Sequence, residues 1–192
     1  MRLSLMNTAT IGVDVPVPCY LSHTDAGQHT LIDTGYAPEV IAASQHPEHR
    51  GIRVSHYRPI VEPLADLGLG VIAIDILSAT HLDTDHAGMI DAFPRAEIVV
   101  QRAQYAAAFT AASPCCAPDR RHWDAPGLRY RQVDGDTVLL PGVALIETGG
   151  ARAGASVGPG PAAPDRAGVA RDRCDQRRRA GRSRQRPAWS IR

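Results

Sequence analysis

The sequence lacks several features, and each absence narrows what the chain can be. Lysine is missing from all 192 residues, so arginine and histidine supply every basic side chain. No apolar run approaches the roughly 20 residues of a membrane-spanning helix, and the first residues carry no apolar stretch typical of a secretion signal. We therefore expect a cytoplasmic protein with no membrane partner.

Cysteine is scarce, and its spacing shows no C-x-x-C motif. The four cysteines are Cys19, Cys115, Cys116 and Cys174. Adjacent cysteines such as Cys115 and Cys116 rarely form a disulfide with each other, and cytosolic thiols stay reduced. We expect all four to be reduced thiols.

Composition divides the chain into two unlike segments. Residues 1–150 carry 10 arginines against 17 acidic residues, a balance of −7, whereas residues 151–192 carry 11 arginines against 3 aspartates, a balance of +8. Histidine, leucine, phenylalanine and tyrosine are all missing from the second segment. Such a segment buries too little apolar surface to offset the entropy lost on folding. The sequence predicts one folded domain over 1–150 and a disordered tail, rich in Arg, Ala, Gly and Pro, over 151–192.

The order of elements in the first segment indicates an α/β fold with a mixed sheet. VPVPCYLSH and HTLIDTG, separated by a DAG turn, are typical of a hairpin. Residues 59–69 follow a proline start with apolar residues at helical spacing. VIAIDILSAT predicts a buried strand, EIVVQ another strand, QYAAAFTAA a short helix, and DTVLLPGVALIET a closing strand pair.

The most informative motif is HLDTDHAG, residues 81–88, because it places two imidazoles and two carboxylates within six positions. It follows a predicted strand, where open α/β sheets usually place their chemistry. The candidate ligands are His81, Asp83, Asp85 and His86. Imidazole and carboxylate groups bind zinc, and two ions roughly 3.5–4 Å apart can activate water against an ester, amide or lactone carbonyl. The motif predicts a dinuclear metal site.

A helix cap is the alternative interpretation of this motif. Asp83 or Thr84 would cap a helix that begins near Ala87, and the histidines would be solvated. The density of ligand types favours the metal site. We expect none of the other histidines to be a ligand, whether they flank the hairpin turn, lie in the polar loop or lie further on: His23, His29, His46, His49, His56 and His122.

HLDTDHAG resembles the H-x-H-x-D-H signature of the metallo-β-lactamase superfamily, and its flanks resemble the N-acyl homoserine lactonases. The matching segments are VPVPCYLSHTDAGQHTLIDTG, HLDTDHAGMIDAFPRAEIVVQRAQYAAA and GDTVLLPGVALIETGG, which together span nearly all of 1–150. The resemblance implies the N-terminal half of an αβ/βα sandwich, with two zinc ions that open the lactone ring of bacterial quorum signals.

The resemblance also implies a role for individual residues. His81 and the Asp83 position would hold the first zinc, while His86 and Asp85 would hold the second, and we assign Asp85 the catalytic role. Asp33, in LIDTG, would support the site without binding metal. A small-molecule lactone is the implied substrate.

Two departures from the family pattern weaken this assignment. Asp83 replaces the second histidine of the signature, and Thr84 stands where several lactonases carry a bulky aromatic residue, which leaves the acyl-chain preference open. The family's later ligands, a third histidine, a bridging aspartate and a final histidine, and its catalytic tyrosine are all missing after ETGG. We expect weak zinc affinity, poor solubility and little or no lactonase activity for the chain as translated.

The unusual tail has two interpretations. A single inserted nucleotide near Gly149 or Gly150 would shift the reading frame, because the codons for Ala151–Gly158, read one base later, permit HAPGHQS, the missing lactonase segment. The rival is a truncated, non-enzymatic product whose arginines bind nucleic acid or an anionic surface. The frameshift is favoured, since it accounts for both the tail and the missing ligands.

Overall fold

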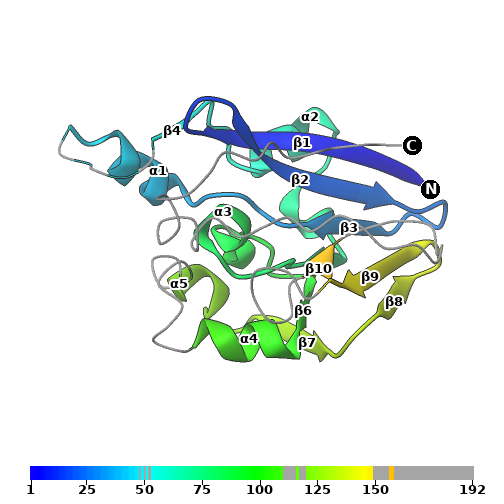
Figure 1. Ribbon diagram of the computed structural model, residues 1–192. Coiled ribbons are helices and arrows are strands. Elements are labelled where there is room, and N and C mark those ends of the chain that lie inside the picture. Colours follow the sequence, from blue (N-terminus) through cyan, green and yellow to red (C-terminus); the bar gives the residue numbers. More distant parts are fainter. Residues whose placement is uncertain are drawn as a thin grey trace, which may run out of the picture.

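The computed structural model describes residues 1–47, 49, 51, 53–109, 116, 120–148 and 156–157. Within these ranges the strands form two sheets, one ordered β4-β1-β2-β3-β5-β6-β7 and a small one ordered β10-β9-β8 (Figure 1). The strands are β1 (Arg2–Ile11), β2 (Val15–His23), β3 (His29–Ile32), β4 (Val54–Ser55), β5 (Ile76–Ser78), β6 (Glu97–Gln101), β7 (Arg129–Val133), β8 (Thr137–Leu140), β9 (Val143–Glu147) and β10 (Ser156–Val157). The helical segments are α1 (Pro38–Gln45), α2 (Val61–Asp66), η1 (Val71–Ala73), α3 (Thr84–Ala87), η2 (Ile90–Ala92), α4 (Arg102–Ala108) and α5 (Arg120–Trp123).

The large sheet is antiparallel on one side and parallel on the other. Strands β1, β2 and β3 pair antiparallel, and β3, β5, β6 and β7 pair parallel. The predicted hairpin is confirmed, because β2 and β3 are paired, with Tyr20 opposite Ile32 at one end and His23 opposite His29 at the other. The mixed sheet also confirms the predicted α/β class.

Side chains of the large sheet alternate between two cores. In β5 and β6, Leu77 and Ile98 join the core that contains the helical residues Leu64 and Trp123. Their neighbours in sequence point the other way and pack against the small sheet, in a cluster made of Ile76, Val99, Val133, Leu139, Val143 and Leu145. Side chains of a strand alternate between the two faces of the sheet. Both faces of β5 and β6 are covered, so residues that point to either face are apolar.

Some predicted boundaries were wrong. The strand expected over VIAIDILSAT is only β5, Ile76–Ser78, preceded by the turn η1. Pairing sets this limit, because its partners β3 and β6 begin at His29 and Glu97. The helix expected over 59–69 is α2, which is shorter, and the closing strand pair is confirmed as β8 and β9.

The structure describes little of the tail. Ser156–Val157 form β10 and pair antiparallel with Ile146 and Glu147 of β9. The rest of 151–192 lies outside the described residues, as do Cys115 and Cys174, so the predicted disorder stays a prediction. Cys19 and Cys116 are both buried, and the reduced state of the four cysteines stays a prediction. None of the described helices is long and apolar enough to cross a membrane.

Candidate metal centre

The candidate ligands lie at one edge of the large sheet because two parallel strands end there. Asp33 follows β3, and Thr80 to His86 follow β5, the strand next to it. Asp33 has a left-handed backbone, with φ of 59°, which few residues other than glycine adopt. The turn that this backbone makes delivers the Asp33 carboxylate toward the segment after β5.

The carboxylate of Asp33 joins the two segments. Its Oδ1 accepts a hydrogen bond from the backbone N–H of Thr80 at 2.8 Å, and its Oδ2 accepts one from the Thr80 hydroxyl at 2.7 Å. Oδ2 also lies 2.7 Å from Nδ1 of His86. With Nδ1 of His86 donating to Asp33, the other ring nitrogen is left to face the site. This is the usual support of a metal-binding histidine.

Asp85 and His86 face each other at the site. Nε2 of His86 lies 3.5 Å from Oδ2 of Asp85. Burial alone would lower the pKa of His86, but the charges of Asp85 and Asp33 outweigh it and raise that pKa well above its ordinary value. Burial opposes the charge of Asp85 too, yet His86 lowers the pKa of this carboxyl strongly. The pair therefore holds opposite charges.

His81 packs against His86 with its ring centroid 3.8 Å away. Burial and the neighbouring His86 lower the pKa of His81, so the ring is neutral at neutral pH and keeps a free lone pair. Its Nδ1 is buried and has no hydrogen-bond partner within the described part of the chain. A buried nitrogen without a partner is costly, and a metal ion would satisfy it.

Asp83 is turned toward a cysteine. Its side chain is buried, and Oδ1 accepts a hydrogen bond from the thiol of Cys116 at 3.1 Å. Asp83 occupies the N-cap position of α3, but no side-chain hydrogen bond caps that helix, which begins at Thr84 rather than near Ala87. The alternative interpretation is therefore right about the position of Asp83, but Asp83 makes no capping hydrogen bond, and Thr84 lies inside the helix rather than at its cap.

Close backbone packing holds α3 against the segment after Asp33. The backbone N–H and the hydroxyl of Thr34 donate to the carbonyl of His86 at 2.7 and 3.0 Å, and the N–H of Gly88 donates to the carbonyl of Gly35 at 2.9 Å. A Cβ at Gly88 would lie 2.3 Å from the backbone nitrogen of Ala37. Only glycine fits here, which explains the last letter of HLDTDHAG.

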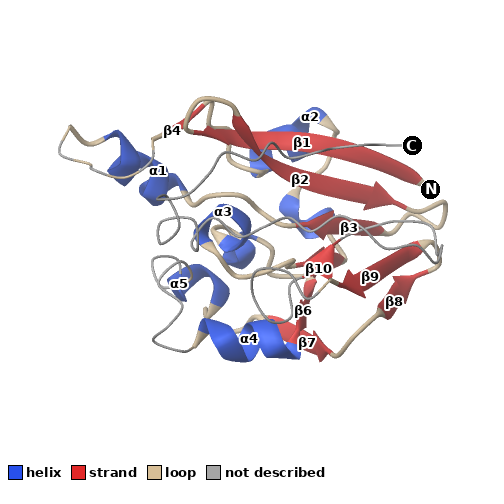
Figure 2. Cartoon of the chain, in the orientation of Figure 1, coloured by secondary structure: helices blue, strands red, loops and turns tan. Residues whose placement is uncertain are grey.

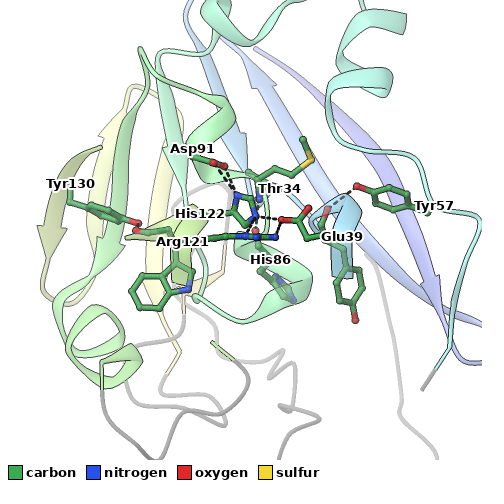
Figure 3. A network of polar contacts seen from close by, with 11 residues as sticks. Thr34, Glu39, Tyr57, His86, Asp91, Arg121, His122 and Tyr130 are labelled. Carbon is green, nitrogen blue, oxygen red and sulfur yellow. Dashed lines mark hydrogen bonds and ion pairs between the residues drawn. The ribbon is translucent and has the colours of Figure 1, made fainter. Parts of the chain in front are cut away.

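A second polar network lies beside the site and ties three helical segments together (Figure 3). Nδ1 of His122, in α5, lies 2.9 Å from Asp91 in η2, and Nε2 lies 2.6 Å from Glu39 in α1. Arg121 also contacts Glu39. Figure 2 shows α1, α3 and α5 gathered at the same end of the molecule. His122 is thus structural, one of the two possibilities expected for it.

Sequence reasoning missed three residues of the site. Thr34, Thr80 and Cys116 all contact predicted site residues, through the hydrogen bonds described above. Thr34 follows Asp33 and Thr80 precedes His81, so adjacency to the motifs was the available signal. Nothing in the local sequence around Cys116 indicates its contact with Asp83.

Comparison with known proteins identifies the family. Residues 12–163 match the Metallo-beta-lactamase superfamily. The chain belongs to this superfamily. Among curated proteins, the N-acyl homoserine lactonase AttM of Rhizobium johnstonii is 35% identical over 138 residues, which cover 64% of this chain and 48% of AttM. An N-acyl homoserine lactonase of a Bacillus species is 32% identical over 157 residues, which cover 77% of this chain and 60% of that enzyme.

A solved structure shares the fold of this metallo-beta-lactamase chain. It is an N-acyl homoserine lactone hydrolase with N-hexanoyl-L-homoserine bound at its catalytic metal centre, and it superimposes with a TM-score of 0.65 at 24% identity, over 81% of this chain and 68% of that one. The predicted fold and the homology to lactonases over the N-terminal part are confirmed. The chain spans about half the length of the curated AttM relative it matches.

The site residues fit a metal ion in part. Two ligands at about 2.0–2.2 Å from one tetrahedral zinc ion lie about 3.4 Å apart, close to the 3.5 Å between Asp85 Oδ2 and His86 Nε2. The buried, unpartnered Nδ1 of His81 is a further donor of the right chemistry. Within the described ranges, however, no three His, Cys, Asp or Glu side chains are grouped so that they could share one ion.

Proposed function

We propose that this chain derives from a zinc-dependent hydrolase that opens the lactone ring of N-acyl homoserine lactones. The observation that carries the proposal is the Asp33–His86–Asp85 array, in which one carboxylate orients the imidazole through Nδ1 and the other faces Nε2. Membership of the metallo-beta-lactamase superfamily and homology to lactonases support the reaction and the substrate class.

The proposal gives each site residue a role. Asp85 and His86 would hold one zinc ion, and His81 and Asp83 would contribute to a second. When bound, zinc lowers the pKa of a water molecule and polarises the carbonyl group. Asp33 keeps the proton on Nδ1 of His86, so that the proton lost on zinc binding would be the one on Nε2.

Asp85 carries the catalytic role in this proposal. Its depressed pKa keeps it ionised at neutral pH, so it accepts a hydrogen bond from the attacking water rather than donating a proton. The oxygen of that water adds to the lactone carbonyl, and the bond to the ring oxygen breaks. One proton of the water passes through Asp85 to the ring oxygen, which leaves as an alcohol, and the other is released to solvent from the new carboxyl group. The product is the N-acyl homoserine carboxylate.

We further propose that the chain as translated is a weak enzyme. Asp83 hydrogen-bonds to Cys116 where the family signature has a histidine, and the described residues hold no group of three potential ligands. A carboxylate in place of an imidazole adds negative charge near the proposed metal and makes the bound water less acidic.

The test is zinc binding and acid release from N-hexanoyl homoserine lactone by the full chain and two variants. Asp85→Asn should lower zinc affinity at least tenfold and abolish any zinc-dependent hydrolysis. Asp14→Asn, at an exposed position, is the matched control and should change neither. Equal zinc binding and hydrolysis in Asp85→Asn and the parent chain would overturn the assignment, and a rate like that of an intact lactonase would overturn the proposed impairment.

We propose that residues 151–192, apart from the short strand β10, form a disordered tail translated out of the family's reading frame. Sequencing the gene across the codons for Thr148–Gly158 tests this directly. An extra base there supports the frameshift. An unbroken frame would make the basic tail genuine, and binding of RNA that weakens with salt and disappears on deleting 151–192 would then support the rival function.

A further inference from the structure

A pair of histidines lies at the opposite edge of the sheet from Asp33. Strand β2 ends at His23 and strand β3 begins at His29, and the two residues are direct cross-strand partners. Nδ1 of His23 lies 2.9 Å from Nε2 of His29, with ring centroids 4.6 Å apart. The sequence places both histidines beside a turn and predicts neither as a ligand, whereas strand pairing brings two ring nitrogens together.

The backbone on both sides of His29 fixes where its ring lies. The N–H of His29 donates to Asp75 Oδ2 at 2.8 Å, and its carbonyl accepts from the N–H of Asp75 at 3.1 Å. In the contact with His23, one of the two facing ring nitrogens carries the proton and the other accepts it with its lone pair. A metal ion that displaces this one proton would meet a lone pair from each ring.

The separation of the two nitrogens suits one class of metal ion. With bonds of about 2.0–2.1 Å, two nitrogens at right angles around a tetragonal ion lie about 2.9 Å apart, whereas tetrahedral positions are about 3.3 Å apart. The 2.9 Å between the two ring nitrogens is the length of the hydrogen bond that joins them, and it is close to the tetragonal separation, so an ion that displaces the shared proton would require little movement of either ring. Copper(II) and nickel(II) prefer this geometry with nitrogen ligands, and copper(II) binds most tightly in the usual order of divalent metals.

The surroundings of the pair leave room for further ligands. A cavity of about 270 Å³ is lined by both histidines and Arg2 and Ser4, together with three leucines, Leu21, Leu67 and Leu69. It is large enough for several water molecules, each of which occupies about 30 Å³ in the liquid. Arg2 is the cross-strand partner of His23 and its charge opposes a cation, whereas Asp75, which contacts His29, favours one.

We propose that His23 and His29 form a second metal site that binds a divalent transition cation of tetragonal preference, copper(II) or nickel(II) ahead of zinc(II). The two imidazoles are its protein ligands, and water from the adjoining cavity completes the coordination. The site goes beyond the proposed lactonase centre, because it lies at the other edge of the sheet and shares no residue with it.

The test uses the full chain without an affinity tag and with added copper(II) at less than one equivalent. Paramagnetic broadening of backbone amide signals locates the ion residue by residue, so binding at 22–30 is separated from binding at 79–88. We expect broadening at 22–30, and at least a tenfold loss of copper affinity there in His23→Ala and in His29→Ala. Arg2→Ala should tighten binding, because a nearby positive charge is removed.

His46→Ala is the matched control, because His46 is exposed and lies in neither site. It should leave the broadening at 22–30 unchanged. If His29→Ala does not fold, the copper affinity of His23→Ala, a substitution at the end of β2, decides the question by itself. Broadening confined to 79–88, tighter zinc than copper binding at 22–30, or equal losses in His46→Ala and His23→Ala would each overturn the proposal, whatever the outcome of the lactone assay.

Discussion

Oδ2 of Asp33 lies 2.7 Å from Nδ1 of His86, although 53 positions separate the two residues in the chain. They meet because β3 and β5 are parallel neighbours and end at the same edge of the sheet. The contact selects the ring nitrogen of His86 that faces Asp85. The orientation of the candidate metal ligands therefore depends on a residue outside the HLDTDHAG motif.

Replacing Asp33 with asparagine should weaken metal binding without removing a ligand. The variant keeps a side chain of the same size but loses the negative charge that orients and polarises His86. We expect zinc affinity to fall by about 10- to 100-fold. Competition against a chromophoric chelator measures it, with Asp14→Asn as the control. An affinity within twofold of the parent chain would show that Asp33 does not support the site.

The stability of the metal-free protein should fall as pH rises above 6.5. Two carboxylates raise the pKa of His86 above its ordinary 6.5, so its contribution is complete below pH 6.5 and is lost as pH rises through the folded pKa. The pKa of Asp85 is depressed from 3.8, so its contribution is present above pH 3.8 and is lost as pH falls. Both contributions are present between these values.

Urea unfolding in EDTA at pH 5.5 and pH 8.5 checks this dependence. The parent chain should have the larger unfolding free energy at pH 5.5. His86→Gln removes the titrating group, so the difference between the two pH values should shrink. An equal pH dependence in the parent and the variant would assign the effect to other groups.

Gly88→Ala should destabilise the fold through a steric clash rather than through backbone strain. The new Cβ would lie 2.3 Å from the backbone nitrogen of Ala37 and 2.7 Å from the carbonyl oxygen of Gly35, and neither can move as a flexible side chain could. We expect a loss of about 1–3 kcal/mol, the usual cost of overpacking. Thermal or urea unfolding measures it.

Gly70→Ala is the matched control for this substitution. No atom lies within 4 Å of a Cβ built at Gly70, and its φ of −99° suits any residue. Its stability should stay within about 0.5 kcal/mol of the parent. Equal losses in the two variants would show that Gly88 is not required for close packing.

His122→Ala should loosen the helical segments around the site. The imidazole contacts Asp91 through Nδ1 and Glu39 through Nε2, so its removal leaves two carboxylates without this partner. We expect the unfolding free energy to fall by about 1.5–3 kcal/mol, the range for hydrogen bonds to charged groups. His46→Ala, at an exposed position, should change it by less than about 0.5 kcal/mol. Faster amide exchange in α1 and α5 of the first variant alone would locate the effect, and unchanged exchange would contradict it.

Local patterns in the sequence predicted much of the fold. The hairpin of β2 and β3, the strand β6 and the pair of β8 and β9 follow from alternation, β-branched residues and turn signals within short windows. The predicted strand was longer than β5, because the limits of β5 depend on where β3 and β6 begin. The sequence pattern of one strand does not indicate where the neighbouring strands of the sheet begin and end.

By itself the sequence determined which chemistry is available: HLDTDHAG supplies imidazoles and carboxylates after a buried strand, and its flanks indicate the family. Only the tertiary structure decided which groups meet. Asp33 faces His86, Asp83 faces Cys116, His122 bridges Glu39 and Asp91, and His23 faces His29. The physical reason is that hydrogen bonds act over about 3 Å, and strand order and register bring distant residues within that range.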